Sequence, residues 1–315
     1  MSLTMPAAVT VDICICTFRR KQLAETVRSL DALTVPDGVE IRLIIADNDV
    51  SPSAEYLVRR LQAEGRHPIL YRHAPAQNIS IARNACLDAA TADFAAFIDD
   101  DETASPGWLV ALLAEAEGAD AVLGPARAVY GPEAPDWMRR GDFHSTLPVW
   151  VNGEIRTGYT CNVLLRRASP AVSGRRFALS LGRSGGEDTA YFTGLTRAGG
   201  RIAYAEGAVV DDPVPANRAT FAWLARRRFR MGQTHGRVVI GDPRGMALAQ
   251  QVALAAAKAG VSFLVAVATA WSAPRRNRSA LRGVMHAGVV SGLLGVTEIT
   301  QYGVIDAAEG KADAA

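Results

Sequence analysis

The sequence predicts an α/β protein built on a mostly parallel, mixed sheet between two layers of helices. Short apolar runs alternate with stretches of helical spacing from residue 9 to residue 130. Several runs are apolar at nearly every position, as expected of strands that are covered on both faces. Polar residues directly follow three of these runs. Ligands of parallel α/β sheets bind beyond the carboxyl ends of the strands, so a site is expected there.

Strands are expected where β-branched and other apolar residues concentrate. The first run is rich in valine and isoleucine, and the fourth is apolar throughout. Each run is separated from the next by a helical stretch, which favours parallel neighbours. The expected strands cover residues 9–16, 41–46, 69–72, 94–98 and 119–130.

The intervening helices are predicted from residue spacing and from start signals. Leu23, Val27 and Leu30 recur at the i, i+4, i+7 spacing of one helical face. Ser51 and Ser105 each precede a proline, which is typical of an N-cap followed by a first-turn proline. Helices are therefore expected to begin near residues 23, 52, 78 and 106.

Composition limits the classes of protein to which the chain can belong. Hydrophobic residues make up 49% of the 315 residues and charged residues 21%, which predicts folded domains. The net charge of +2 predicts no strong overall field. The four cysteines match no zinc spacing and are expected to stay reduced. The N-terminus lacks a signal-peptide pattern, so the catalytic part is expected in the cytoplasm.

The apolar run at 94–98 ends in four consecutive acidic residues, 99–102. Neighbouring carboxylates repel one another unless a cation lies between them. Mg²⁺ and Mn²⁺ prefer oxygen ligands, often combined with substrate phosphates. A solvated acidic loop explains the run equally well. Polar residues at 17–20 and 47–49 follow two other strands, and three such strand ends indicate one shared site.

A glycine-rich loop precedes a second group of acids. Gly182, Gly185 and Gly186 lead into Glu187 and Asp188 at the expected start of a helix. The positive end of the helix dipole favours carboxylates there, so helix capping alone is one explanation. Capping does not require two glycines before two acids, which favours a functional role.

Prolines and aromatic residues concentrate between residues 131 and 170. Trp137 and Trp150 belong to this stretch. They either cover the core or form a platform on which the apolar face of a sugar stacks.

The second half of the chain contains basic and apolar segments. Residues 218–237 are rich in arginine but carry no nucleic-acid-binding motif, so a phosphate clamp or an anionic membrane surface is expected and nucleic acid is not. Residues 252–271 and 283–296 are apolar, with the basic segment 272–278 between them. This pattern predicts two helices at or partly inside the cytoplasmic leaflet, or two helices packed on the catalytic domain.

Five segments resemble the motifs of family 2 glycosyltransferases, which have the GT-A fold. One such motif is weak evidence of kinship, but five in the right order and spacing indicate the family. The resemblance implies a GT-A three-layer fold with a C-terminal helical extension. The segments are Cys-Thr-Phe-Arg-Arg at 16–20, Ile-Ile-Ala-Asp-Asn-Asp at 44–49, Asn-Ile-Ser-Ile-Ala-Arg-Asn at 78–84, Phe-Ile-Asp-Asp-Asp-Glu at 97–102 and Gly-Gly-Glu-Asp-Thr at 185–189.

The resemblance also implies a UDP-sugar donor and a divalent cation, Mg²⁺ or Mn²⁺. In the D-x-D pair, Asp101 corresponds to the direct metal ligand, and Asp99 corresponds to a second acid closer to the ribose. Asp100 lies between them and is expected to point to the other side of a strand. Asp47 corresponds to the acid that binds uracil. The residues implied to surround the nucleotide are Thr17, Arg19, Asp47, Arg83 and Asp99.

For the acceptor side, the resemblance assigns Asp188 as general base of an inverting displacement. Glu187 is then expected to bind the acceptor or to orient Asp188, and Trp137 and Trp150 to contact the acceptor. The chain departs from the family at Asp211, where relatives often have a histidine near the metal. Aspartate also ligates hard cations, so Asp211 is a candidate ligand and the metal preference stays open.

The implied reaction transfers glucose from UDP-glucose to a polyprenyl-diphosphate-linked oligosaccharide, in β-1,4 linkage. It belongs to exopolysaccharide synthesis at the cytoplasmic face of the inner membrane. A nucleotidyltransferase is one alternative, although that class usually has a glycine-rich loop after the first strand, which residues 16–20 lack. A non-catalytic membrane scaffold with a degenerate GT-A domain is another, and the intact acids count against it.

The expected domain organisation follows from these segments. A catalytic domain spans 1–240, with a nucleotide half at about 1–130 and an acceptor half at about 131–240. Membrane-associating helices cover 241–304, and 305–315 form a flexible tail.

Overall fold

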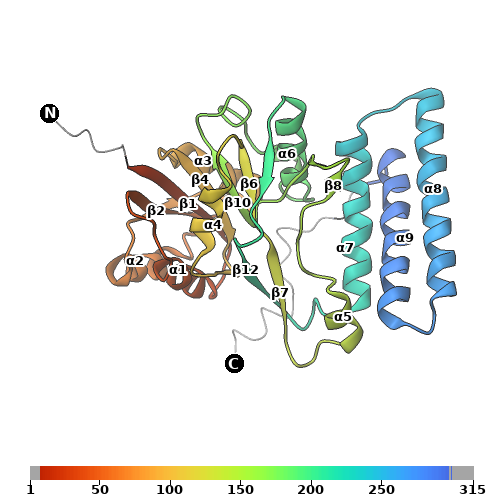
Figure 1. The fold of residues 1–315 in the computed structure, drawn as a ribbon, viewed down its shortest axis with the longest axis horizontal. Coiled ribbons are helices and arrows are strands. Elements are labelled where there is room, and N and C mark those ends of the chain that lie inside the picture. Colours follow the sequence, from red (N-terminus) through yellow and green to blue (C-terminus); the bar gives the residue numbers. More distant parts are fainter. Residues whose placement is uncertain (1–7, 298, 300–315) are drawn as a thin grey trace.

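The computed structural model describes residues 8–297 and 299 of the chain. Its centre is a seven-stranded sheet with the strand order β11-β6-β10-β4-β1-β2-β3 (Figure 1). The strands of this sheet are β1 (Val9–Thr17), β2 (Val39–Asp47), β3 (Ile69–His73), β4 (Phe94–Asp99), β6 (Ala121–Leu123), β10 (Asn162–Arg166) and β11 (Ile202–Tyr204).

The pairing of these strands confirms the mostly parallel, mixed sheet. β1 runs parallel to β2 and to β4, and β2 runs parallel to β3. β10 is antiparallel to both of its neighbours, β4 and β6. The carboxyl ends of β1, β2 and β4 therefore meet at one edge, where the register places Thr17 beside Asp47 and Cys16 beside Asp99.

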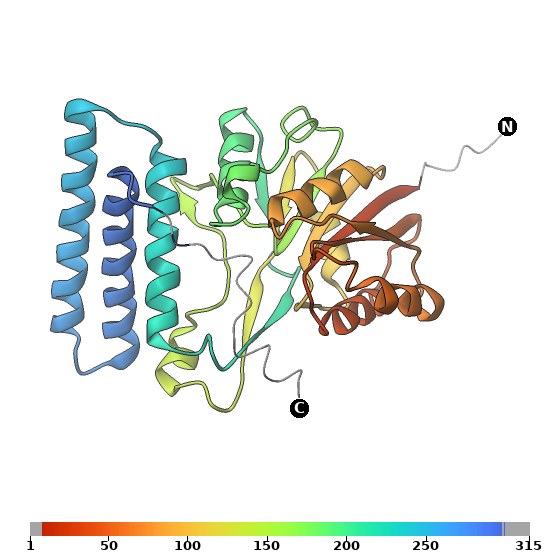
Figure 2. The ribbon, with the colours of Figure 1, turned by 180° about the vertical axis from the view of Figure 1, so that it is seen from behind.

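Helices cover both faces of the sheet (Figure 2). Successive side chains of a strand point to opposite faces. Ile13 and Ile15 of β1 accordingly pack with residues of α1, α2 and α4, whereas Cys14 packs with residues of α3 and α6. These helices are α1 (Leu23–Asp31), α2 (Glu55–Glu64), α3 (Ile79–Ala89), α4 (Trp108–Ala114) and α6 (Glu187–Arg197).

The strand predicted over 119–130 is wrong in one respect, because it forms two strands in different sheets. β6 ends at Leu123, and β7 (Ala126–Tyr130) pairs with β12 (Val210–Val214). Gly124 and Pro125 separate them. Proline lacks the N–H that a continuing ladder needs, and a Cβ at Gly124 would lie 2.4 Å from the carbonyl oxygen of Ala208. The remaining short strands are β5 (Thr103–Ala104), β8 (Trp150–Val151) and β9 (Glu154–Ile155).

The two Ser-Pro pairs do not cap helices as predicted. α2 begins at Glu55 and α4 at Trp108, and their N-cap residues are Ala54 and Gly107. At α2, the Asp47 carboxylate accepts the N–H of Ala54 at 2.8 Å. The hydrogen bond therefore holds the N-cap residue of α2 against the end of β2, and no side chain caps the helix. By contrast, Asn78 caps α3 as the motif at 78–84 suggests, since its side chain accepts the N–H groups of Ser80 and Ile81.

The C-terminal half ends in three long helices that lie side by side in the order α7, α9, α8 (Figure 1; Figure 2). The basic segment expected between two helices instead forms the first turns of α9, because that helix begins at Ala273. One helix of the described residues, α8, is long and apolar enough to cross a membrane. The elements are α5 (Asp136–Gly141), α7 (Phe221–Thr234), a π-helical turn (His235–Ile240), α8 (Gly245–Ala268) and α9 (Ala273–Leu293).

α9 also packs on the rest of the protein. Leu281 of α9 is buried in a cluster with Met138 of α5 and Leu224 of α7. The predicted boundary at 240 therefore separates helices that share a core. Residues 300–304 of the expected helical segment and the expected tail 305–315 lie outside the described residues.

Candidate active site

The acidic run begins at the last residue of β4. Asp99 ends the strand, and Asp100 and Asp101 form the following turn. Arg20, which follows β1, lies 4.0 Å from Asp100 and 3.7 Å from Asp101, measured between nitrogen and oxygen. Asp100 therefore does not point away from Asp101, as strand alternation had suggested, because the strand has already ended.

Glu102 has a structural place in this turn. Its side chain is buried and accepts the backbone N–H of Asp99 at 3.1 Å. Its carbonyl oxygen accepts the hydroxyl of Thr26 at 2.7 Å. Burial raises the pKa of Glu102 well above its usual value, and the nearby charge of Asp99 raises it further. The Glu102 side chain thus closes the turn through its hydrogen bond to the backbone of Asp99.

Asp99 connects the two acidic segments of the sequence. Burial raises its pKa to about 6. Negative charge on Asp101, Asp212 and Asp188 raises this pKa further, whereas the Arg83 guanidinium lowers it. The end of β4 and the start of α6, nearly ninety residues apart, therefore contribute charges to the same site.

The glycine loop sets the position of Asp188. Gly185 and Gly186 have φ values of +84° and +96°, which favour glycine. A Cβ at Gly185 would lie 2.0 Å from a guanidinium nitrogen of Arg230 on α7. Asp188 follows in the first turn of α6 and is partly exposed. Its Oδ1 accepts the N–H of Thr189 at 2.6 Å.

Glu187 and Arg83, which sequence analysis gave separate roles, bind each other. Arg83 Nη1 donates to Glu187 Oε1, and both side chains are buried. Burial raises the pKa of Glu187, while Arg83 lowers it. The other oxygen of Glu187 is buried without a hydrogen-bond partner. The pair therefore connects α6 to α3 at the residue next to Asp188.

The structure does not bring Asp211 to the acids. Asp211 on β12 forms a two-pronged bond to Arg127, at 2.7 and 3.0 Å. Its neighbour Asp212 has the opposite orientation, as expected along a strand. Burial raises the pKa of Asp212 to about 6, and Asp101 contributes to this rise. Asp211, the candidate ligand from the motif, is thus paired with Arg127, and its neighbour Asp212 lies within electrostatic range of Asp101.

The predicted nucleotide residues lie together at the carboxyl ends of β1 and β2. Thr17 and Asp47 are buried there. Asp47 accepts hydrogen bonds from Ala54 N at 2.8 Å and from the Tyr71 hydroxyl at 2.8 Å, so local structure occupies part of its carboxylate. Arg19 is half exposed and donates to both oxygens of Asp49, at 2.7 and 3.0 Å.

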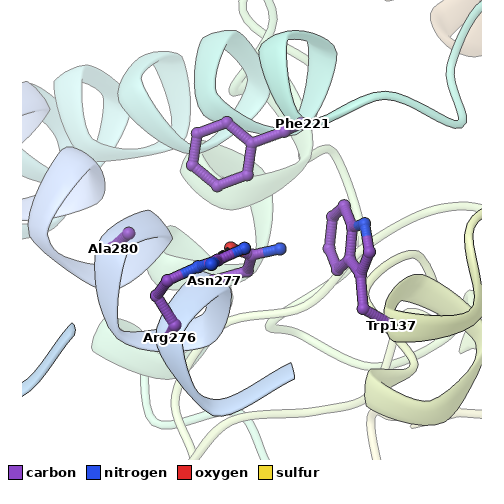
Figure 3. Close-up of a pocket in the computed structure, with 5 residues that line it drawn as sticks. All are labelled: Trp137, Phe221, Arg276, Asn277 and Ala280. Carbon is purple, nitrogen blue, oxygen red and sulfur yellow. Dashed lines mark hydrogen bonds between the residues drawn. The ribbon is translucent and has the colours of Figure 1, made fainter. Parts of the chain in front are cut away.

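The two predicted acceptor tryptophans lie on different elements. Trp150 on β8 is 55% exposed. Trp137 on α5 packs edge-on against Phe143 and lines a cavity of about 400 Å³ with Phe221, Arg276, Asn277 and Ala280 (Figure 3). That cavity is formed by α5, α7 and α9, so Trp137 lies apart from the strand-end acids.

Two arginines of the basic segment 218–237, for which a phosphate clamp was one expectation, lie near the acids. The guanidinium carbons of Arg218 and Arg227 lie 5.9 and 5.4 Å from the ring centre of Trp223. Both arginines lower the pKa of Asp212. The arginine-rich segment 218–237 was recognised, but its orientation depends on Trp223, which stacks on buried His144.

The donor atoms fit a divalent cation that is shared with a substrate. Asp99, Asp101 and Asp212 supply carboxylate oxygens whose mutual repulsion favours a cation. Within residues 8–297 and 299, no group of three or more acidic, histidine or cysteine side chains is arranged to hold a metal ion alone. Mg²⁺ and similar ions commonly take one or two carboxylates and complete their shell with phosphates and water.

Comparisons with known proteins agree with this geometry. The family model described as glycosyl transferase family 2 matches residues 12–170. The succinoglycan biosynthesis protein ExoM of Rhizobium meliloti (strain 1021) is 61% identical over 93% of this chain and 96% of its own. A glucosyl-dolichyl phosphate glucuronosyltransferase of Haloferax volcanii is 27% identical over 70% of this chain and 75% of its own.

Solved structures share the fold. The mannosyltransferase PcManGT from Pyrobaculum calidifontis, solved in complex with GDP-Man and Mn²⁺, aligns with a TM-score of 0.59. The alignment covers 93% of this chain and 92% of that one, at 18% identity. At this identity the likeness supports the fold alone.

Proposed function

The chain belongs to the family 2 glycosyltransferases, and on that premise we propose that it transfers a hexose from a UDP-sugar to a lipid-linked oligosaccharide with inversion. Membership favours glycosyl transfer over the nucleotidyl transfer and scaffold alternatives. The observation that carries the proposal is the convergence of Asp99, after β4, with Asp188, at the start of α6. One belongs to the donor side of the site and the other to the acceptor side.

Asp188 is proposed as the general base. The attacking hydroxyl must lose its proton as it displaces the nucleotide, and a carboxylate within hydrogen-bond reach contributes roughly 10² to 10⁴-fold. The bond from Thr189 to Oδ1 fixes the carboxylate and leaves Oδ2 to accept this proton. Of the two roles expected for Glu187, acceptor binding and orientation of Asp188, its buried pair with Arg83 supports the second, so Glu187 is proposed to position Asp188.

On the donor side, Asp101, with Asp99 and Asp212, is proposed to hold the divalent cation. Such a cation stabilises the negative charge of a leaving diphosphate as a Lewis acid. Arg218 and Arg227 supply further positive charge beside Asp212. The proposed nucleotide-binding residues are Thr17, Arg19, Asp47 and Asp99, and Trp150 is the proposed acceptor platform.

The finer substrate assignment comes from the relatives. The name of the R. meliloti protein supports a place in succinoglycan-type exopolysaccharide synthesis. Within that synthesis, we propose UDP-glucose as donor and β-1,4 linkage to a polyprenyl-diphosphate oligosaccharide, as the motif resemblance implies. The name of the H. volcanii protein includes a dolichyl phosphate, which supports a lipid-linked acceptor. Apolar α8 supports a location at the cytoplasmic face of the inner membrane.

The proposal is tested with Asp188→Asn. This change should reduce hexose transfer to membranes bearing lipid-linked intermediates by at least 10²-fold, because the base is lost. UDP affinity, measured by calorimetry with Mn²⁺, should stay within about threefold of wild type. Substantial remaining transfer would rule out Asp188 as the base. A panel of radiolabelled UDP-glucose, UDP-galactose and GDP-mannose with the wild-type protein identifies the donor.

A further inference from the structure

Two adjoining cavities lie where α5 meets the N-terminal turns of α9, outside the acidic site. Trp137 lines both. The first, of about 400 Å³, also involves Phe221 of α7 and Arg276 of α9 (Figure 3). The second is of about 440 Å³. Its other lining residues are Asp136, Arg140, Trp271, Ser272, Ala273 and Pro274. We call the two together the α5–α9 hollow.

The α5–α9 hollow has an excess of positive charge. Arg140 and Arg276 line it, against one carboxylate, Asp136. Within residues 8–297 and 299, neither arginine forms an ion pair, and Arg276 donates only to the side chain of Asn277, at 3.1 Å. Arg278, by contrast, donates to the carbonyl oxygen of Gly141 at 2.5 Å and so holds α9 against α5. Arg278 thus fixes the position of α9 against α5, whereas Arg140 and Arg276 remain able to bind an anion in the hollow.

Among the residues that the structure describes, one apolar side of the neighbouring helix α8 has no packing partner. Its buried residues, such as Ala255 and Ala259, face α9. Lys258 is the one charged residue of α8 and is exposed. Exposed apolar residues along α8 and the turn that follows are Met246, Leu254, Val261, Phe263, Leu264, Val265, Val267 and Trp271.

The charged residues of the surrounding sequence are all positive. Residues 243–297 contain no aspartate or glutamate. Their lysine and arginine residues are Arg244, Lys258, Arg275, Arg276, Arg278 and Arg282. At a membrane surface, apolar residues lie among the acyl chains, tryptophan lies at the interface and arginine contacts lipid headgroups. The apolar α8, Trp271 in the turn after it and the arginines of α9 follow the same order along the chain.

We propose that the α5–α9 hollow binds the phosphate headgroup of an anionic membrane lipid while α8 lies along the apolar part of the same leaflet. The inference rests on the proposed function, which places the enzyme at a membrane. Charge complementarity favours this occupant. In a two-fold dimer through the same face, identical surfaces would meet. The four arginines of two copies would then be brought together with only the two Asp136 carboxylates as counter-charge.

Binding of the full-length protein to lipid vesicles is measured by flotation. One set of vesicles is pure phosphatidylcholine, and the other contains about 30 mol% phosphatidylglycerol, which gives a surface charge of roughly physiological magnitude. Wild type should bind the anionic vesicles more tightly. Arg140→Gln with Arg276→Gln should weaken that binding roughly thirtyfold, since each arginine at an anionic surface contributes about fivefold. The matched control is Arg59→Gln with Arg60→Gln on α2, which removes the same charge at the far end of the molecule (Figure 1).

A second variant separates the hollow from a diffuse basic surface. Ala280→Leu keeps every charge and fills part of the first cavity. It should weaken binding to the anionic vesicles severalfold and leave the weak binding to pure phosphatidylcholine unchanged. The proposal is overturned if the Arg140/Arg276 variant binds anionic vesicles as tightly as wild type. It is also overturned if the α2 control weakens binding as much as that variant does, or if Ala280→Leu leaves binding unchanged.

The test is independent of glycosyl transfer. Slow hydrolysis of the UDP-sugar in the absence of acceptor reports the donor site, and the Arg140/Arg276 variant should retain the wild-type rate. If hydrolysis persists and the vesicle preference is absent, the headgroup site fails alone. If vesicles bind as expected and no sugar nucleotide is turned over, the proposed function fails and the headgroup site stands.

Discussion

At the scale of single residues, the alternation of β12 decides which acid serves the candidate metal site. Asp211 pairs with Arg127, whereas Asp212 interacts with Asp101. We predict that Asp212→Asn weakens Mn²⁺-dependent UDP binding about 10- to 100-fold, the usual cost of losing a group that supports a metal. Calorimetric titration of UDP with and without Mn²⁺ measures the effect.

Asp211→Asn is the matched control for this prediction. It changes the adjacent residue in the same way but breaks only the partly exposed pair with Arg127, at a cost below about 1 kcal/mol. UDP binding should therefore remain close to wild type. The reverse order of effects would show that β12 presents Asp211 to the nucleotide.

His144 is a residue whose titration should be visible in the stability of the fold. It is buried, stacks on Trp223 and bonds through Nε2 to the carbonyl oxygen of Arg218 at 3.1 Å. Burial lowers its pKa to about 4, and the surrounding Arg227 and Arg218 contribute. The unfolded chain, with a histidine pKa of about 6.5, binds this proton first. The free energy of unfolding should therefore fall as pH drops from about 6.5 toward 4.

The variant His144→Gln isolates this contribution. Other buried groups titrate in the same range, so the quantity to compare is the difference between wild type and variant in urea midpoint at several pH values. That difference should shrink as pH falls from about 7 to 4.5, because only the wild type loses stability through His144. Parallel curves would mean that His144 titrates normally in the folded protein.

At the scale of elements, α7 and α9 approach closely through glycines. A Cβ at Gly288 would lie 2.0 Å from the carbonyl oxygen of Phe229, and one at Gly232 would lie 2.0 Å from that of Met285. Because both obstacles are backbone, neither helix can yield locally. We predict that Gly288→Ala destabilises the protein by about 1–3 kcal/mol, as overpacking does. Thermal unfolding followed by circular dichroism measures it.

Gly260 in α8 provides the control for Gly288. A Cβ there meets nothing within 4 Å. Gly260→Ala should be neutral or should stabilise the helix by up to about 1 kcal/mol, since alanine is the better helix former. If both variants unfold alike, the close α7–α9 contact is not present in solution.

The elements that the sequence predicted well are those with local causes. The strands at 9–16, 41–46, 69–72 and 94–98 correspond to β1 to β4, because continuous apolar runs bounded by helices have few alternatives. The split of 119–130 was missed because it depends on the approach of Ala208 to Gly124, a contact between distant segments. The start of α2 was misplaced because no side chain caps that helix and because the Asp47 carboxylate, at the end of β2, accepts the N–H of Ala54.

In the candidate site, too, the features with local causes were predicted and those that depend on contacts between segments were not. The strand-end acids and the acids after the glycine loop were found by position alone, because topology brings such ends together. The partners with which individual side chains of the site interact were not predicted from the sequence. The pairing of Arg83 with Glu187 joins residues 104 positions apart, and the orientation of Arg218 and Arg227 depends on how Trp223 packs. No local pattern encodes such contacts.

At the scale of the whole molecule, the acids and the outer helix lie on different parts of the protein. The carboxyl ends of the sheet strands lie at the candidate active site, while α7, α9 and α8 form a layer beside it with α8 outermost (Figure 2). Only 17% of the most apolar window of α8 is buried. An exposed apolar surface of this kind marks a contact with a membrane or another protein.

The outer side of α8 should decide where the protein is found after cell lysis. Val261 and Leu264 are 60% and 71% exposed on that side. Val261→Glu with Leu264→Glu removes two apolar groups that each contribute roughly 1.5 kcal/mol when buried in lipid, so partition into membranes should fall on the order of a hundredfold.

Val50→Glu with Val129→Glu is the control, because these exposed valines lie outside the helical layer. Fractionation by ultracentrifugation, with unfolding temperatures to verify folding, compares the two. A membrane-bound α8 variant would assign the anchor to another surface.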